Sequence, residues 1–150
     1  MICRYPHGMP SLSVSRRAAL WLPPIVYMGV MFHLSSESEP LPALTAHVWD
    51  KLLHLIEYGG LAALVCRALL GEGLGWLTAV AGAIVAASLY GASDEWHQSF
   101  VPMRDSDVRD WVADTLGGMA GALTYGVVRW KRPVRWDVTR NQERTGNHGP

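Results

Sequence analysis

The sequence predicts an all-α fold, a polytopic membrane four-helix bundle with both termini in the cytoplasm. Of its 150 residues, 49% are hydrophobic and only 17% are charged, a composition typical of membrane proteins. The hydrophobic residues fall into four blocks, and basic residues flank the first and the last block. A soluble helical bundle is the alternative, but the third block has no polar face of the kind that a soluble helix needs.

The four blocks are predicted to be four transmembrane helices. They cover residues 18–34, 52–70, 74–92 and 111–128, each close to the ~20 residues that cross the hydrocarbon core. Pro23, Pro24 and His33 interrupt the first block. Proline near a helix start is tolerated, and neighbouring helices can satisfy freed carbonyl groups. The third block contains no ionisable residue and no proline, which makes it the clearest span.

Charged residues predict the topology. Arg16 and Arg17 precede the first block, and Arg129, Lys131 and several further arginines follow the last. Because cytoplasmic loops of membrane proteins are enriched in lysine and arginine, both ends of the chain are expected in the cytoplasm, with the bundle in the inner membrane. We therefore expect a cytoplasmic segment at 1–17, a transmembrane domain at 18–130 and a polar, disordered cytoplasmic tail at 131–150.

Polar side chains concentrate at the predicted outer ends of the second, third and fourth blocks. At about 100° per residue, Asp50, His54 and Glu57 fall on one helix face. Asp107, Asp110 and Asp114 share a face on the fourth block, and that face continues into a glycine pair. Asp107 and Asp110 also suit the start of a helix, where the dipole favours carboxylates. The third block ends with three further polar candidates, Asp94, Glu95 and Gln98.

The glycines predict where the fourth helix packs. Gly117 and Gly121 form a GxxxG spacing, which lets two transmembrane helices approach closely. Because glycines mark the packing face, the aspartates aligned with them should point into the bundle. Asp114 lies about one turn inside the predicted membrane boundary, where an ionised carboxylate needs a partner or water. Arg104, in the preceding loop, is a candidate partner and a candidate phosphate ligand.

Several classes of site are not indicated. The zero net charge gives no reason to expect nucleic-acid binding. His54 with Glu57 and Asp94 with His97 have an i, i+3 spacing that resembles carboxylate–histidine ligand pairs, but their order matches no strong metal signature. We therefore expect neither a metal nor another cofactor. No GxSxG motif or phosphate-binding glycine loop predicts a covalent nucleophile or a nucleotide site.

Three segments of this chain together resemble the VanZ-like family of bacterial membrane proteins. They are Asp50-Lys51 with His54 and Tyr58-Gly59, the stretch SDEWHQSFVPMR from Ser93 to Arg104, and DWVADTLGGMAG from Asp110 to Gly121. The match covers residues 50–125 in the family's order and spacing. The family often has asparagine where this chain has Asp114, so a role that needs a neutral amide there is in doubt.

The resemblance implies a set of motif positions but no defined reaction. The family is named after a protein encoded with glycopeptide-resistance genes, which implies a contribution to teicoplanin resistance in some members. Carried onto this chain, the motif positions are Asp50, His54, Tyr58, Asp94, Glu95, Gln98, Arg104, Asp110, Asp114 and Gly117.

Four functional hypotheses remain open at this stage. In the first, a polar pocket at the outer membrane interface binds a phospholipid or a lipid-linked cell-wall precursor, with Arg104 holding the phosphate. In the second, the same pocket is catalytic, with His54 or Glu57 as general base. The third hypothesis is a non-enzymatic scaffold. The fourth is a proton-coupled transporter, a function that four short spans would support only if the protein forms an oligomer. Sequence leaves the oligomeric state open.

Overall fold

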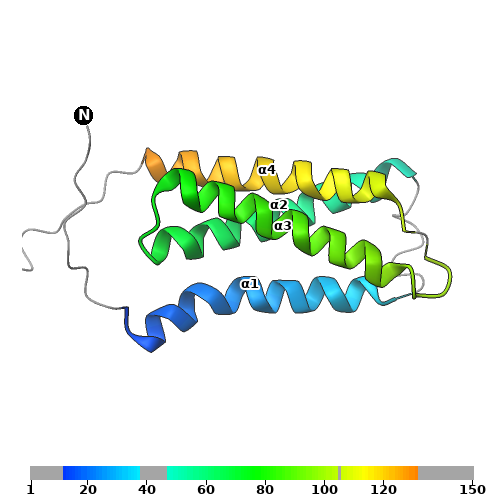
Figure 1. The fold of residues 1–150 in the computed structure, drawn as a ribbon, viewed down its shortest axis with the longest axis horizontal. Helices are drawn as coiled ribbons and strands as arrows, with labels where there is room; N and C mark the ends of the chain where they lie inside the picture. Colours follow the sequence, from blue (N-terminus) through cyan, green and yellow to red (C-terminus); the bar gives the residue numbers. More distant parts are fainter. Residues whose placement is uncertain (1–11, 38–46, 105, 132–150) are drawn as a thin grey trace, which may run out of the picture.

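The computed structural model of this protein describes residues 12–37, 47–104 and 106–131. Over these ranges the chain forms four α-helices and no strand: α1 (Val14–Ser35), α2 (His47–Gly71), α3 (Trp76–Gln98) and α4 (Val108–Trp130). Consecutive helices run in opposite directions, so α1 begins at the end of the bundle where α4 finishes (Figure 1). The predicted all-α four-helix fold is confirmed. The predicted disordered tail, from residue 132 onward, lies outside the described residues.

Helices α1, α2 and α4 extend beyond both ends of the apolar blocks that predicted them, whereas α3 begins two residues after the predicted start and extends beyond the predicted end. Hydropathy marks only the apolar part of a helix, whereas capping groups decide where the backbone hydrogen bonds begin and end. Helix α1 begins at Val14, because the Ser13 side chain accepts a hydrogen bond from the Arg16 backbone at 3.4 Å, and the helix continues through Pro23 and Pro24. Helix α3 likewise continues through six polar and aromatic residues to Gln98.

Three of the four helices have the length and composition of membrane spans. They are α1, the Lys51–Gly71 part of α2, and α3, each with a mean hydropathy of 1.4 over its best window. Helix α4 does not meet the same hydropathy criterion, although its 23 residues extend about 35 Å. The protein is therefore a membrane protein with at least three apolar helices long enough to span the bilayer. That α4 also spans, and that the termini are cytoplasmic, remain predictions.

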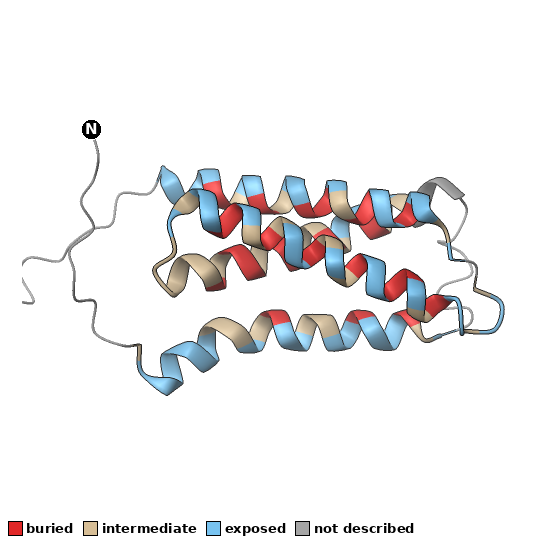
Figure 2. Cartoon of the chain, in the orientation of Figure 1, coloured by how far each residue is buried: buried red, intermediate tan, exposed pale blue. Residues whose placement is uncertain are grey.

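The surface of the bundle supports its placement in lipid. Large apolar side chains point outward along the helices, with Leu77 72% and Leu89 66% exposed, while the faces turned toward neighbouring helices are buried (Figure 2). Aromatic pairs lie near both ends. Trp96 and Phe100 meet edge to face with ring centroids 5.8 Å apart, and Trp76 and Trp130 do so at 6.3 Å. Such pairs suit the two membrane–water interfaces.

Helices α2 and α4 form the closest contact in the bundle. A Cβ atom on Gly117 would lie closer than 3.0 Å to the backbone of Leu55, and one on Gly121 would do the same to the backbone of Gly59. The two backbones therefore touch where the glycines lie, as a GxxxG contact requires. Helix α3 packs against both α2 and α4 through small residues such as Ala83 and Ala87.

Helix α1 packs mainly on α2 and has few contacts with α3. Near its middle, the Tyr90 hydroxyl of α3 donates a hydrogen bond to the Met28 carbonyl at 2.7 Å. Toward its C-terminal end, Ser36 Oγ and His97 Nε2 are 3.0 Å apart. At the opposite end, Glu72 accepts a hydrogen bond from Trp21 Nε1 at 3.2 Å and forms an ion pair with Arg17. Polar contacts thus hold α1 at three levels.

Candidate functional site

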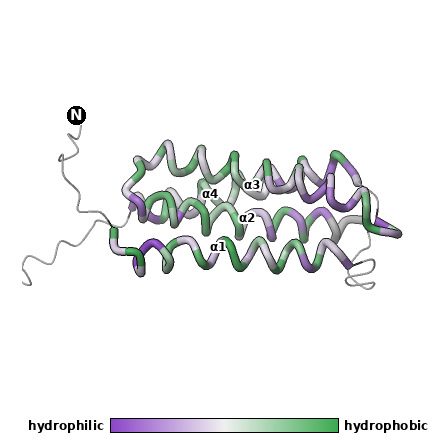
Figure 3. Tube along the Cα trace, turned by 60° about the horizontal axis from the view of Figure 1, so that its bottom comes forward, coloured by the Kyte–Doolittle hydropathy of each residue, from purple (hydrophilic) through white to green (hydrophobic). Residues whose placement is uncertain are grey.

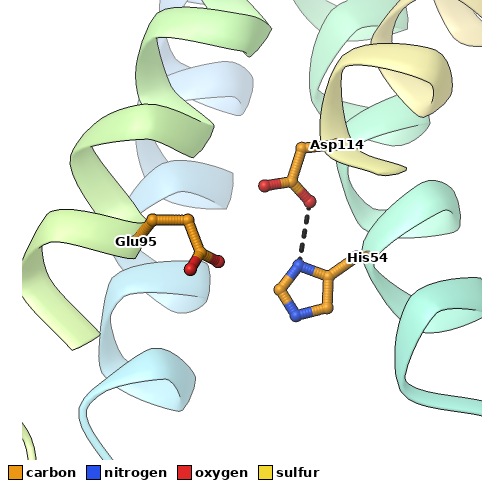
Figure 4. Close-up of side chains that lie close together, drawn as sticks. All are labelled: His54, Glu95 and Asp114. Carbon is orange, nitrogen blue, oxygen red and sulfur yellow. Dashed lines mark hydrogen bonds and ion pairs between the residues drawn. The ribbon is translucent and has the colours of Figure 1, made fainter. Parts of the chain in front are cut away.

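A buried polar cluster lies at the end of the bundle where α2 and α4 begin and α3 finishes. Hydrophilic residues concentrate at this end (Figure 3). His54 of α2, Glu95 of α3 and Asp114 of α4 point toward one another from three different helices (Figure 4). His54 Nδ1 and Asp114 Oδ1 are 2.8 Å apart, and one ligand atom of each of the three residues lies within 4.8 Å of the others. All three side chains are buried, and Asp114 has no exposed surface at all.

Small residues make room for Asp114 inside the bundle. A Cβ atom on Gly91 of α3 would lie 2.7 Å from Asp114 Oδ2, so any larger residue there would displace the carboxylate. One turn further along α4, a Cβ on Gly118 would lie 3.0 Å from the Ala87 side chain. The glycine-rich stretch after Asp114 therefore brings α4 close enough to α2 and α3 for the carboxylate to meet His54.

A second group of charges surrounds the start of α4. Lys51 Nζ forms an ion pair with Asp110, and it lies 3.6 Å from Asp107 Oδ2. Asp107 is the N-cap of α4, and its side chain accepts a hydrogen bond from the Arg109 backbone at 2.9 Å. That hydrogen bond and the charge of Lys51 lower the pKa of Asp107, which lies outside the membrane-spanning segments.

Glu95 connects α3 to the start of α4. Its Oε2 atom accepts a hydrogen bond from the Asp107 backbone N–H at 2.8 Å, whereas its Oε1 atom is buried without a hydrogen-bond partner among the described residues. One oxygen is therefore fixed by the backbone and the other faces the cluster. Asp114 has the same arrangement, because His54 holds Oδ1 while Oδ2 is buried without a partner in the described part of the chain.

Asp94, Gln98 and Tyr58 lie beside this cluster. Gln98 Nε2 donates a hydrogen bond to Asp94 Oδ2 at 3.0 Å. The Tyr58 hydroxyl is directed toward Asp94 and interacts with its carboxylate, although within the described ranges neither that hydroxyl nor Asp94 Oδ1 forms a hydrogen bond of ordinary geometry. The Tyr58 ring is stacked beside His54, with centroids 6.3 Å apart and planes inclined by 4°. Buried polar atoms are normally satisfied, so this concentration of unsatisfied ones indicates a ligand site.

Among the remaining sequence candidates, Glu57 is half-buried on α2 and acts electrostatically on Tyr27 of α1, so it is directed toward α1. Arg104 is half-buried in the loop after α3, where its backbone N–H donates to the Val101 carbonyl at 3.2 Å. Asp50 belongs to α2, but its side chain lies outside the described residues.

Lys51 is the main site residue that the sequence candidates did not include. It precedes His54 by three residues, so it lies on the same face of the helix, and that spacing was a usable signal. Its position between two α4 carboxylates depends on how α2 packs against α4, which helical phasing alone does not give.

An apolar cleft of about 350 Å³ opens between α1 and α3 next to the cluster. Its walls are mostly aromatic, with Phe32, Tyr90, Trp96 and Phe100, and the polar residues Ser93, Asp94 and His97 complete the lining. Asp94 therefore borders both the buried cluster and a cleft at the lipid-facing surface. The cleft therefore reaches one polar residue beside the cluster from the side of the bundle.

The chain matches a known protein family. A family model described as VanZ/LLP1 matches residues 9–129, which include α1, α2, α3, all of α4 except its final residue, and the whole buried cluster. None of the curated proteins and none of the solved structures matches the chain. With most of its length covered by that model, this chain belongs to the VanZ/LLP1 family of proteins.

Proposed function

We propose that this protein binds a phosphate-bearing lipid of the bacterial envelope, either a phospholipid or a lipid-linked cell-wall intermediate. The observation that carries the proposal is the aromatic cleft between α1 and α3, which leads from the lipid-facing surface to Asp94, a neighbour of the buried cluster. A site of this form suits an amphipathic ligand, because its apolar walls take a hydrocarbon chain and its inner end takes a polar head group.

Arg104 is the proposed ligand of the phosphate. It follows α3 at the polar end, and among the described residues its guanidinium forms no ion pair. A guanidinium binds phosphate through two parallel hydrogen bonds, which a lysine cannot reproduce. The proposal places Arg104 against the phosphate, and the unsatisfied oxygen of Asp94 against hydroxyl or amino groups of the same ligand.

The charge distribution supports an outward-facing site. The opposite end of the bundle carries Arg16, Arg17, Arg67, Arg129 and Lys131 among the described residues, as the cytoplasmic side of an inner-membrane protein does. The polar cluster then lies on the outer side, where cell-wall intermediates are used. A protein that holds such a lipid would alter its supply, and the family resemblance to a glycopeptide-resistance protein extends the proposal to teicoplanin tolerance.

The test is retention of lipid by the purified protein. Wild-type protein is extracted in mild detergent and analysed by native mass spectrometry, with lipids identified after release. We expect about one phosphate-bearing lipid per chain, and at least about a tenfold loss in Arg104→Ala. Arg109→Ala is the matched control, since Arg109 is an exposed cation at the same end, and it should retain the lipid.

Two results would count against lipid binding. One is wild-type protein that retains no phospholipid or polyprenyl phosphate, and the other is retention that is equal in Arg104→Ala and wild type. In cells, deletion of the gene should change the teicoplanin concentration that inhibits growth, and Arg104→Ala should fail to restore it. If Arg104→Ala restores the wild-type level of resistance, Arg104 does not hold the phosphate.

The buried His54–Asp114 pair favours one second candidate, an enzyme that acts on such a lipid. An ionised Asp114 accepts the hydrogen bond from His54 Nδ1–H, which leaves Nε2 as a proton acceptor. Glu95 faces this pair and supplies a second acid–base group. The enzyme hypothesis alone predicts turnover. Envelope lipids incubated with the protein should change in mass, and Glu95→Gln should bind the lipid without changing it.

A further inference from the structure

Three metal-ligating side chains converge at the centre of the polar cluster. His54, Glu95 and Asp114 each contribute one atom to a group whose members lie within 4.8 Å of one another. They come from α2, α3 and α4, so the group forms only when the bundle is folded (Figure 4). Each of the three is more than nine-tenths buried, with exposed fractions of 8%, 7% and 0%.

Both carboxylates have one oxygen fixed and one oxygen unused. The Asp107 backbone holds Glu95 Oε2, and His54 holds Asp114 Oδ1. Glu95 Oε1 and Asp114 Oδ2 are buried and have no hydrogen-bond partner among the residues that the structure describes. A ligating carboxylate is oriented by a hydrogen bond to its second oxygen, as the Asp107 backbone orients Glu95. The hydrogen bond between His54 and Asp114 joins two of the proposed ligands, and metal binding through His54 Nδ1 would replace it.

The local charge favours a cation. Asp94, Glu95, Asp110 and Asp114 are all buried at this end of the bundle. Lys51 forms its described ion pairs with Asp107 and Asp110, at the rim of the cluster rather than at its centre. Buried carboxylates without a compensating charge are costly in a membrane protein, and a bound divalent ion removes that cost for several of them at once.

We propose that His54, Glu95 and Asp114 bind one divalent transition-metal ion. One imidazole nitrogen with two carboxylate oxygens suits Zn²⁺, Mn²⁺ or Fe²⁺, whereas Ca²⁺ and Mg²⁺ are bound by oxygen alone. Binding would draw the three ligand atoms to roughly 3 to 4 Å from one another, a movement within the range of a glutamate side chain. Three protein ligands leave further coordination positions open, as in metal sites that bind a substrate. The site goes beyond lipid binding and requires no lipid.

The surroundings of His54 support its role as a ligand. The Tyr58 ring stacks beside the imidazole at 6.3 Å and restricts its rotation. The third donor, Glu95, is positioned by the N-cap residue of α4. The sequence pattern missed the site, because the three ligands are 41 and 19 residues apart in the chain and no local spacing joins them.

The test uses the full-length protein in detergent, stripped with a chelator and dialysed against Mn²⁺ or Zn²⁺. Elemental analysis should find one ion per chain in the wild type. His54→Gln, Glu95→Gln and Asp114→Asn should each weaken binding at least about tenfold, the loss that removal of even a supporting group produces. Glu72→Gln is the matched control. It removes a carboxylate at the opposite end of the bundle, where glutamine can still accept the hydrogen bond of Trp21 Nε1, and it should bind the ion as tightly as the wild type.

A second measurement includes a wild-type result that does not depend on how the variants fold. Pulsed electron paramagnetic resonance of the Mn²⁺-loaded wild type should detect coupling to the nitrogen of one imidazole. The coupling should vanish in His54→Gln and persist in His33→Gln, because His33 is an exposed residue of α1. Substoichiometric metal, absence of nitrogen coupling in the wild type, or coupling that survives His54→Gln would each overturn the proposal. None of these outcomes depends on whether lipid is retained.

Discussion

Replacement of Gly121 by alanine tests whether the backbones of α2 and α4 touch. The added Cβ would lie closer than 3.0 Å to the backbone of Gly59, and a backbone atom cannot rotate away as a side chain can. The helices must separate, a change that costs about 1–3 kcal/mol in a packed interior. Alanine also gains about 1 kcal/mol over glycine in any helix, which would hide part of that cost.

Gly29→Ala is the matched control because Gly29 lies in α1 and a Cβ there would meet nothing within 4 Å. Both variants gain the same helix propensity, so the difference between them isolates the steric cost of about 1–3 kcal/mol. That difference corresponds to roughly 2 to 12 °C in the unfolding midpoint of a chain of this size.

Thermal unfolding of the detergent-solubilised variants, followed by tryptophan fluorescence, measures this difference. We expect Gly29→Ala to unfold at or slightly above the wild-type midpoint. Gly121→Ala should unfold several degrees below Gly29→Ala. If Gly121→Ala unfolds at the same temperature as Gly29→Ala, the helices do not approach as closely as described, and the packing argument for Asp114 fails with it.

Three further predictions concern the polar end and the topology. His54→Ala should lower the free energy of unfolding by about 3–5 kcal/mol, because it leaves Asp114 buried without its partner. Asp114→Asn keeps a hydrogen bond and should lower it less. Chemical denaturation in detergent distinguishes the two variants. The pKa of Asp107 is lower in the folded protein than its ordinary value of 3.8. Its capping contribution to stability is therefore present above pH 3.8 and is lost as the pH falls through the pKa of the folded state. Asp107→Ala lacks this contribution, so it should lose less stability in acid than the wild type does. Reporter fusions at each end of the chain should be active only as cytoplasmic reporters, and an external signal at either end would reverse the predicted topology.

The number and approximate position of the helices could be predicted from the sequence, because each hydrophobic block corresponds to one helix. The block at 74–92 is uninterrupted and predicts most of α3, but it ends six residues before the helix does, at Gln98. The missing turn and a half is polar, and hydropathy does not distinguish a polar helix end from a loop. Likewise, α4 is less apolar than the other helices because its packing face combines glycines, which contribute little hydropathy, with two aspartates, which lower it.

The site was predictable to the level of helix faces but not of contacts. Phasing placed His54 and Asp114 on inward faces, and the structure brings them to 2.8 Å. It also grouped Glu57 with His54, although Glu57 is directed toward Tyr27 of α1 instead. A shared face about 60° wide covers two neighbouring helices in a bundle, so only the packing arrangement decides which of them each side chain meets.

The contact between α2 and α4 makes the polar cluster depend on a helix that is synthesised after α2 and α3. When α2 and α3 have entered the bilayer, His54 and Glu95 are present, but Asp114 and the backbone of Asp107 that orients Glu95 are not. Until α4 inserts, these polar groups face lipid or one another without their final partners. A nascent chain that stops before α4 would therefore present exposed charges within the membrane, a feature by which a quality-control protease could recognise it as unfinished.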